Sequence, residues 1–228
     1  MSEIKKGALV AKQVLTDDEL TLINRHTLRA LTSDEVFTFR VVACDNQVDR
    51  DTERFTEDAL ETMAKLFVGR PFIMDHAWSA AKQTARIYAG TVEDAGNGVK
   101  QLILRAYMLR SEVTQPTIDA IEAGILKEVS VGVLSESFTC SICGRDYFAL
   151  DCPHRRGSVY DGKTCHVDLD GITDAFELSF VAVPAQPGAG VIKRYEGKEA
   201  DKPADDEASK LQAAQALLEL EYKRFGKE

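Results

Sequence analysis

The chain lacks any continuous apolar stretch of about 18 residues, the length that a membrane-spanning helix requires. Its opening residues carry no long apolar run either, so we expect no signal peptide. Basic residues are in the minority, with 28 Lys and Arg against 37 Asp and Glu and a net charge of −9. This balance argues against general nucleic-acid binding, which depends on a cationic surface.

Two familiar site signatures are also missing. The sequence contains no glycine-rich phosphate loop and no regular strand–helix alternation, which disfavours a doubly wound parallel sheet. It contains no His-Glu-x-x-His pattern, which disfavours a zinc hydrolase. What remains is a chain of 228 residues with 44% hydrophobic content, enough for one sizeable core, or for a core domain with a small appendage.

Short apolar segments separated by turns dominate the middle of the chain. Their patterning predicts strands over residues 36–43, 85–93, 100–109, 127–134 and 174–183, and helices over residues 57–67 and 114–123. This mixed order fits a mainly β protein of the α+β class, either a β-barrel or a curled antiparallel sheet with helices around it. We expect an arm or short strand and turn over residues 1–35, a β domain over 36–192 with an insertion at 137–167, and a charged linker with an amphipathic helix over 193–228.

Four of the five cysteines lie within 26 positions, in the segment that we expect to be inserted. Cys140 and Cys143 form a Cys-x-x-Cys pair followed by glycine, the turn in which two sulfurs converge on one zinc ion. A tetrahedral site needs two more ligands, and the candidates that follow are Cys152, His154, Cys165 and His166. A zinc ion with four protein ligands has no open coordination position, so its role would be structural.

A serine and a histidine form the candidate catalytic pair. Ser130 lies within the predicted strand 127–134, and His76 ends an apolar run. The other three histidines fall in the arm or the cysteine segment, which leaves His76 as the base that a serine nucleophile needs. Glu177, a carboxylate within an apolar strand, is the favoured orienting group, with Asp75 and Asp174 as rivals.

Four segments in this order resemble the prohead (capsid maturation) serine proteases of tailed bacteriophages, distant relatives of the herpesvirus assemblins. They are VDRDTERF at 48–55, VGRPFIMDH at 68–76, LKEVSVGV at 126–133 and ELSFVAVPAQP at 177–187. The resemblance covers residues 36–190. It implies a small β-barrel surrounded by helices, with Ser130 as nucleophile, His76 as general base and Glu177 as the third member.

The resemblance also implies ligands, substrates and a location. The zinc ligands would be Cys140 and Cys143 with Cys152 and His154, and Cys165 remains the alternative. The enzyme would cut scaffolding protein, a scaffold-like part of the major capsid protein, or its own tail, inside the immature capsid in the host cytoplasm. The protein could also associate with itself, and no nucleic-acid or membrane partner is expected. Arg86 and backbone N–H groups near Ser130 are candidate oxyanion donors.

Two other functions compete with this hypothesis. In the first alternative, the chain has the same fold and a structural zinc site but is catalytically inactive, and it acts as a capsid-assembly or scaffold-binding protein. It would alternatively be a zinc-ribbon interaction module on an unrelated β domain. Replacement of Ser130 separates both from a protease, because only the protease loses its activity when the hydroxyl is removed.

Overall fold

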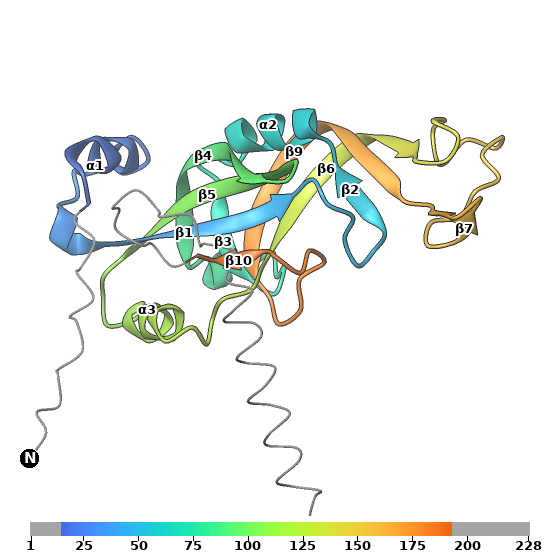
Figure 1. The fold of residues 1–228 in the computed structure, drawn as a ribbon. Coiled ribbons are helices and arrows are strands. Elements are labelled where there is room, and N and C mark those ends of the chain that lie inside the picture. Colours follow the sequence, from blue (N-terminus) through green and yellow to red (C-terminus); the bar gives the residue numbers. More distant parts are fainter. Residues whose placement is uncertain (1–14, 193–228) are drawn as a thin grey trace, which may run out of the picture. The chain divides into compact units, whose positions relative to one another are not determined.

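The computed structural model describes residues 15–192, which lie within one compact unit spanning Lys12–Arg194. These residues form a strongly curved sheet with three α-helices beside it (Figure 1). The helices are α1 (Asp17–Asn24), α2 (Glu57–Leu66) and α3 (Gln115–Glu122). The strands are β1 (Val36–Asp45), β2 (Glu53–Phe55), β3 (Pro71–Met74), β4 (Ala85–Gly96), β5 (Val99–Leu109), β6 (Val129–Cys140), β7 (Val159–Tyr160), β8 (Lys163–Thr164), β9 (Val167–Phe180) and β10 (Gly190–Val191).

The main sheet has the order β10-β1-β5-β4-β3-β9-β2, with β6 paired to β9. It is an open sheet, so the expectation of a closed β-barrel is wrong. Where closure would occur, β10 meets the start of β6 through a single isolated bridge between Glu128 and Gly190. A single bridge is too short to pair β10 with β6 continuously, so the sheet does not close. The mainly β character with packed helices, expected from the sequence, is confirmed.

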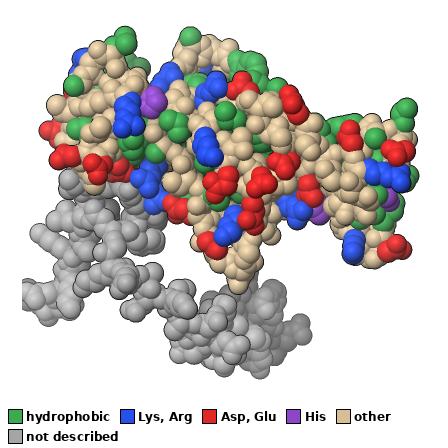
Figure 2. All heavy atoms as spheres, turned by 90° about the horizontal axis from the view of Figure 1, so that it is seen from above, with side chains coloured by type: hydrophobic (Ala, Val, Ile, Leu, Met, Phe, Trp, Pro, Cys, Tyr) green, Lys and Arg blue, Asp and Glu red, His purple; other side chains and the backbone are tan. Residues whose placement is uncertain are grey.

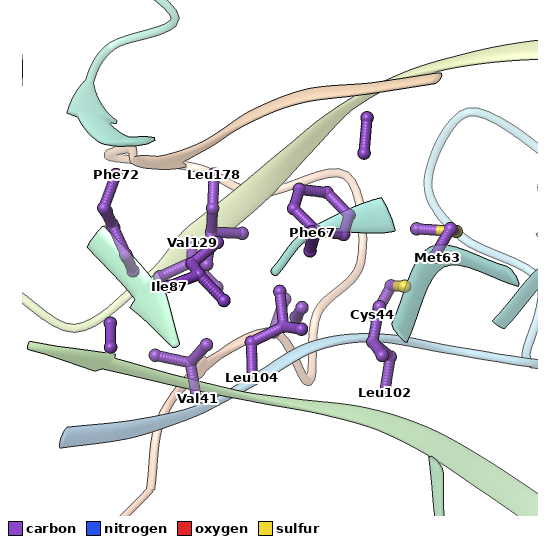
Figure 3. Packing of buried hydrophobic residues seen from close by; sticks show 14 of the residues in the cluster. Val41, Cys44, Met63, Phe67, Phe72, Ile87, Leu102, Leu104, Val129 and Leu178 are labelled. Atoms are coloured by element: carbon purple, nitrogen blue, oxygen red, sulfur yellow. The ribbon is translucent and has the colours of Figure 1, made fainter. Parts of the chain in front are cut away.

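The hydrophobic core lies between the curved sheet and α2. Thr56 caps α2 by accepting a hydrogen bond from the Ala59 amide, and the helix buries Leu60 and Met63 on one face. Figure 3 shows Met63 and Phe67 directed towards side chains from β1, β5 and β9. The helix packs against β4, β5 and β9, and β9 is the strand that carries Glu177.

Several element boundaries differ from the prediction. Residues 17–24 form α1, where the sequence was assigned to a poorly patterned arm, although Thr16 and Glu19 form a complete capping box. Strand β6 continues to Cys140 and β9 begins at Val167, so the two strands extend into the cysteine segment as one long ribbon (Figure 1). The amphipathic helix expected within residues 193–228 lies outside the described residues.

Charged side chains of both signs are interspersed over the face of the molecule seen in Figure 2. Six ion pairs between carboxylates and Arg or Lys span the described surface at 2.6–2.9 Å, from Arg29–Glu35 to Arg145–Asp151. None of the helices within residues 15–192 has the length and apolar content to cross a membrane.

Candidate active site and metal centre

His76 is positioned by a tight turn at the end of β3. Asp75 and His76 both have positive φ, at 55° and 51°, and the Ala77 amide donates to the Met74 carbonyl at 2.9 Å. These features define a type I′ turn, which is uncommon without glycine or asparagine. Strained backbone of this kind persists where surrounding contacts hold it in place. Here the Asp75 amide donates to the Phe180 carbonyl of β9 at 2.9 Å.

The histidine ring is held by a buried carboxylate. His76 Nδ1 lies 2.7 Å from Oε1 of Glu177, whose residue is only 3% exposed, whereas the histidine side chain is 42% exposed. A neutral imidazole that donates from Nδ1 keeps its lone pair on Nε2. The arrangement therefore leaves Nε2 of His76 as the atom able to accept a proton. The histidine is the more exposed of the two side chains.

A third residue completes the hydrogen bonding of that carboxylate. The hydroxyl of Ser179 donates to Oε2 of Glu177 at 2.6 Å, and it accepts the amide proton of His76 at 3.0 Å. Ser179 is completely buried. Both oxygens of the buried carboxylate thus have a partner, as a charge away from water requires.

Ser130 faces this network from the neighbouring strand. It pairs directly with Ser179, and Gly132 pairs with Glu177, so the four side-chain positions share one face of the β6–β9 ribbon. Ser130 is partly exposed. No hydrogen bond within residues 15–192 joins its hydroxyl to His76, and the connection between the two residues runs through Ser179.

Gly132 leaves the space that Glu177 occupies. A Cβ atom built on Gly132 would collide with Oε1 of Glu177 and would lie 3.1 Å from its Cδ. The carboxylate therefore leans across β6 directly above the glycine. Its backbone has no positive φ, so the need for glycine here is one of space and not of conformation.

The rival residues from the sequence lie in other interactions. Asp174 pairs with Arg70 at 2.7 Å, and Asp75 is an exposed turn residue. Arg86 donates to the Gly69 carbonyl at 2.8 Å and to the Gln83 side chain at 3.1 Å. Of the three carboxylates considered, Glu177 is the one that the fold brings to His76.

A groove of about 430 Å³ runs along β6 beside Ser130. One side of β6 pairs with β9. The other side is covered at its start, where the Val191 amide donates to the Lys127 carbonyl at 2.8 Å, and at its far end, where the Tyr147 amide donates to the Phe138 carbonyl at 2.7 Å. Within the described chain, the edge of β6 beyond Ser130 therefore faces this groove. The opposite end of the site carries Trp78, 75% exposed, whose ring lies 5.3 Å from that of Phe176.

Phe176 owes its position to an irregularity in β9. The register changes between Gly132, opposite Glu177, and Val133, opposite Ala175, so Phe176 is an extra residue in a β-bulge. Phe176 directly precedes Glu177 in the sequence, so the residue that contacts Trp78 adjoins the carboxylate that binds His76. Sequence reasoning missed Ser179, Trp78 and Phe176. The Glu-x-Ser spacing was the available signal for Ser179, because alternate strand residues share a face.

The far end of the β6–β9 ribbon carries a cluster of metal ligands. Donor atoms of Cys140, Cys143, Cys152 and His154 all lie within 4.8 Å of one another. The Gly144 amide donates to the Cys140 carbonyl at 2.8 Å and Gly144 has φ +69°, which forms the turn expected after Cys-x-x-Cys. The four residues predicted from the sequence are therefore together, as a candidate metal site.

Two observations test whether these residues fit a metal ion. The sulfurs of Cys143 and Cys152 lie 3.8 Å apart. Four ligands at the usual Zn–S distance of about 2.3 Å give a tetrahedral edge of about 3.8 Å. In addition, Nδ1 of His154 is buried without a hydrogen-bond partner among the described residues. A buried ring nitrogen in that state requires a partner, and a metal ion supplies one.

Cys165 adjoins the cluster without belonging to the group of four. Its sulfur lies 3.9 Å from that of Cys140, and its residue is buried. Burial and the neighbouring Cys140 sulfur raise the pKa of the Cys165 thiol to about 11. Burial acts in the same direction on Cys140, but hydrogen bonds from the amides of Cys143 and Ile142 outweigh it and lower that pKa to about 6. His166 faces Asp168 at 3.3 Å.

Both candidate centres therefore belong to the same pair of strands. The carboxylate and serines lie at one end of the β6–β9 ribbon, and the thiols and His154 lie at the other. We compared the chain with protein-family models, curated proteins and solved structures, and none of the three gave a match.

Proposed function

We propose that this chain is a serine endopeptidase in which Ser130 is the nucleophile, His76 the general base and Glu177 the group that orients the base. The observation that carries the proposal is the short contact between His76 Nδ1 and the buried Glu177 carboxylate, beside a serine on the same face of the sheet. A serine hydroxyl is a weak nucleophile and needs a base held in this tautomer.

The reaction would follow from these positions. The Ser130 oxygen attacks the peptide carbonyl while its proton passes to Nε2 of His76, and the imidazolium returns that proton to the departing amine. Water then adds to the acyl-enzyme and releases the acid. Glu177 stabilises the transient positive charge on the ring. The hydrogen bond between the Ser130 hydroxyl and Nε2 of His76 would form when substrate binds, since catalytic hydrogen bonds often tighten only in the complex.

An extended segment of another protein is the substrate that suits this site. The uncovered edge of β6 borders the groove at Ser130, and an exposed strand edge binds extended peptides through backbone hydrogen bonds. By the resemblance of its four motifs, the substrate would be phage scaffolding protein or a scaffold-like part of the major capsid protein, within the prohead. Confinement there would raise the effective concentration of both partners.

The metal would be a structural zinc ion. Cys140 ends β6 opposite Val167 of β9, and Cys143, Cys152 and His154 follow in the connection between these strands. Zinc bound by these four residues would supply cross-linking and no open coordination position. It would fix the far end of the ribbon whose near end carries Ser130 and Glu177.

The test is co-expression of the chain with the scaffold and capsid proteins encoded beside it, followed by intact-mass measurement. Ser130→Ala removes the nucleophile. Ser137→Ala is the matched control, because it makes the same change on the same strand outside the site and the groove. Zinc content and thermal unfolding are measured for all three proteins, so that loss of the fold is recognised.

Defined fragments with the parent chain and with Ser137→Ala, but not with Ser130→Ala, would support the proposal. Their ends would give the cleavage specificity. Unchanged masses in the presence of assembled shells and folded, zinc-loaded protein would refute it. The chain would then act as a catalytically inactive assembly factor.

A further inference from the structure

The hydrogen bonds around Ser179 connect three elements that are distant in the sequence. Strand β9 lies between β3 and β6, and Ser179 pairs with Ile73 on one side and Ser130 on the other. Its hydroxyl contacts both the amide of His76 and the carboxylate of Glu177. One side chain therefore touches two members of the proposed triad and lies directly opposite the third.

We propose that Ser179 is a positioning residue, which fixes His76 and Glu177 relative to Ser130 and thereby determines how reactive Ser130 is. This inference rests on the proposed protease function. It concerns geometry alone, since Ser179 does not reach the substrate. The residue is fully buried, and its proton is directed to Oε2 of Glu177, so it does not serve as a nucleophile itself.

The carboxylate has two oxygens and two tasks. With Oε2 held by the Ser179 hydroxyl at 2.6 Å, Oε1 is the oxygen that remains for Nδ1 of His76. Without that hydroxyl, Oε2 would be buried and unpaired, and the carboxylate would rotate to regain a partner. Such a rotation would withdraw Oε1 from the imidazole and release the ring from its tautomer and orientation.

The same hydroxyl holds the backbone of the base. The His76 amide, in the strained turn with φ 51°, donates to Ser179 at 3.0 Å. Loss of this acceptor would remove one of the two hydrogen bonds that the turn's backbone amides donate to β9, leaving the bond from the Asp75 amide to the Phe180 carbonyl. A shift of about 1 Å in a catalytic group is enough to reduce a rate by about 100-fold.

The inference is tested with Ser179→Ala and a probe that does not depend on the natural substrate. A fluorophosphonate forms a bond between phosphorus and an activated serine oxygen, releases fluoride, and passes the serine proton to the base. Its rate of reaction at Ser130, located by peptide mass mapping, measures activation directly. We expect Ser179→Ala to lower this rate by about 10- to 100-fold, with a similar fall in kcat and little change in KM.

Two comparisons separate positioning from general stability. Thr84→Val is the matched control, because it removes a hydroxyl that donates to the Phe72 carbonyl of β3 at 3.1 Å without touching the triad. Ser179→Thr keeps the hydroxyl and should restore most of the rate. The downfield proton resonance of the His76 Nδ1–H group should be present in the parent and Thr84→Val proteins and lost in Ser179→Ala.

Each outcome decides between defined alternatives. If Ser130 reacts equally fast in the parent protein and Ser179→Ala, the inference is wrong and the protease proposal stands. If the folded parent neither reacts with the probe nor cleaves its neighbours, the protease proposal fails and the inference fails with it. If Ser179→Ala does not fold, Ser179→Cys preserves the volume with a weak donor, and a rate equal to that of the parent in this variant would overturn the inference.

Discussion

Replacement of Gly132 by alanine should have the opposite effect from the usual one. Where glycine has an ordinary backbone conformation, a change to alanine stabilises a protein by about 0.4–1 kcal/mol, because the unfolded chain loses freedom. Gly132 has no positive φ, so this gain is available in principle. The new methyl group would nevertheless collide with Oε1 of Glu177. We therefore expect Gly132→Ala to destabilise the fold.

The size of the effect follows from the two hydrogen bonds that the displaced carboxylate would lose. Hydrogen bonds to a charged group are worth about 1.5–3 kcal/mol each. The bond to His76 is taken at the low end because that side chain is 42% exposed, whereas Ser179 is fully buried. With about 1.5 kcal/mol for the His76 bond and about 3 kcal/mol for the buried Ser179 bond, less the gain of about 0.4–1 kcal/mol from the unfolded chain, the expected net loss is about 4 kcal/mol. For a domain of this size, that loss lowers Tm by about 8–16 °C.

The assay is thermal and urea unfolding of Gly132→Ala, of Glu177→Ala and of the double variant, together with peptide cleavage by each. Removal of the Glu177 side chain makes room for the methyl group. In the Glu177→Ala background the alanine at position 132 should therefore cost less than about 0.5 kcal/mol. Cleavage by Gly132→Ala should fall by about 100-fold or more, since the base loses its orienting group.

Two results would refute this reasoning. Equal or greater stability of Gly132→Ala would mean that Glu177 does not lean across the glycine. Additive losses in the double variant would mean that the damage at position 132 does not pass through the carboxylate. In either case the close packing of Glu177 over β6 would not describe the protein in solution.

Three further predictions concern the metal, the carboxylate and the tryptophan. The pKa of Cys140 is lowered to about 6, so this thiol is mostly ionised at pH 7. Because protons compete with zinc for thiolates, bound zinc should be retained at pH 7 and largely released by pH 4, as a chromogenic chelator would report; retention at pH 4 would contradict a thiolate site. Glu177→Gln keeps the size of the side chain but removes its charge, so kcat should fall by about 100-fold or more while Tm falls less than in Gly132→Ala, and full activity would exclude Glu177 from catalysis. Trp78 is the only tryptophan and lies two residues after His76, so a peptide spanning a cleavage site should shift the emission of Ser130→Ala on binding, and no shift at saturation would place the peptide elsewhere.

Local features determined the parts that the sequence predicted well. The Thr56 cap and the apolar stripe that follows it specify α2, and the Gly96-Asn97-Gly98 turn specifies the β4–β5 hairpin. The Cys-x-x-Cys-Gly spacing likewise predicted that Cys140 and Cys143 would converge. In each case the interacting residues are close in the chain, so their own conformational preferences decide the outcome. The helix α1 was missed even though the capping box of Thr16 and Glu19 is a local signal of the same kind.

The arrangement of the candidate active site was decided by strand register, which acts over long distances in the chain. His76 and Glu177 are 101 positions apart, and the sequence favoured Glu177 without excluding its rivals Asp75 and Asp174. Only the parallel pairing of β3 with β9 and the antiparallel pairing of β6 with β9 bring Glu177, Ser179 and Ser130 to one face beside His76. A shift of one residue in either ladder would turn these side chains to the opposite face. The failure of the sheet to close has the same origin, because the number of backbone hydrogen bonds between β10 and β6 depends on where Gly190 meets Glu128 in space and not on any pattern within either segment.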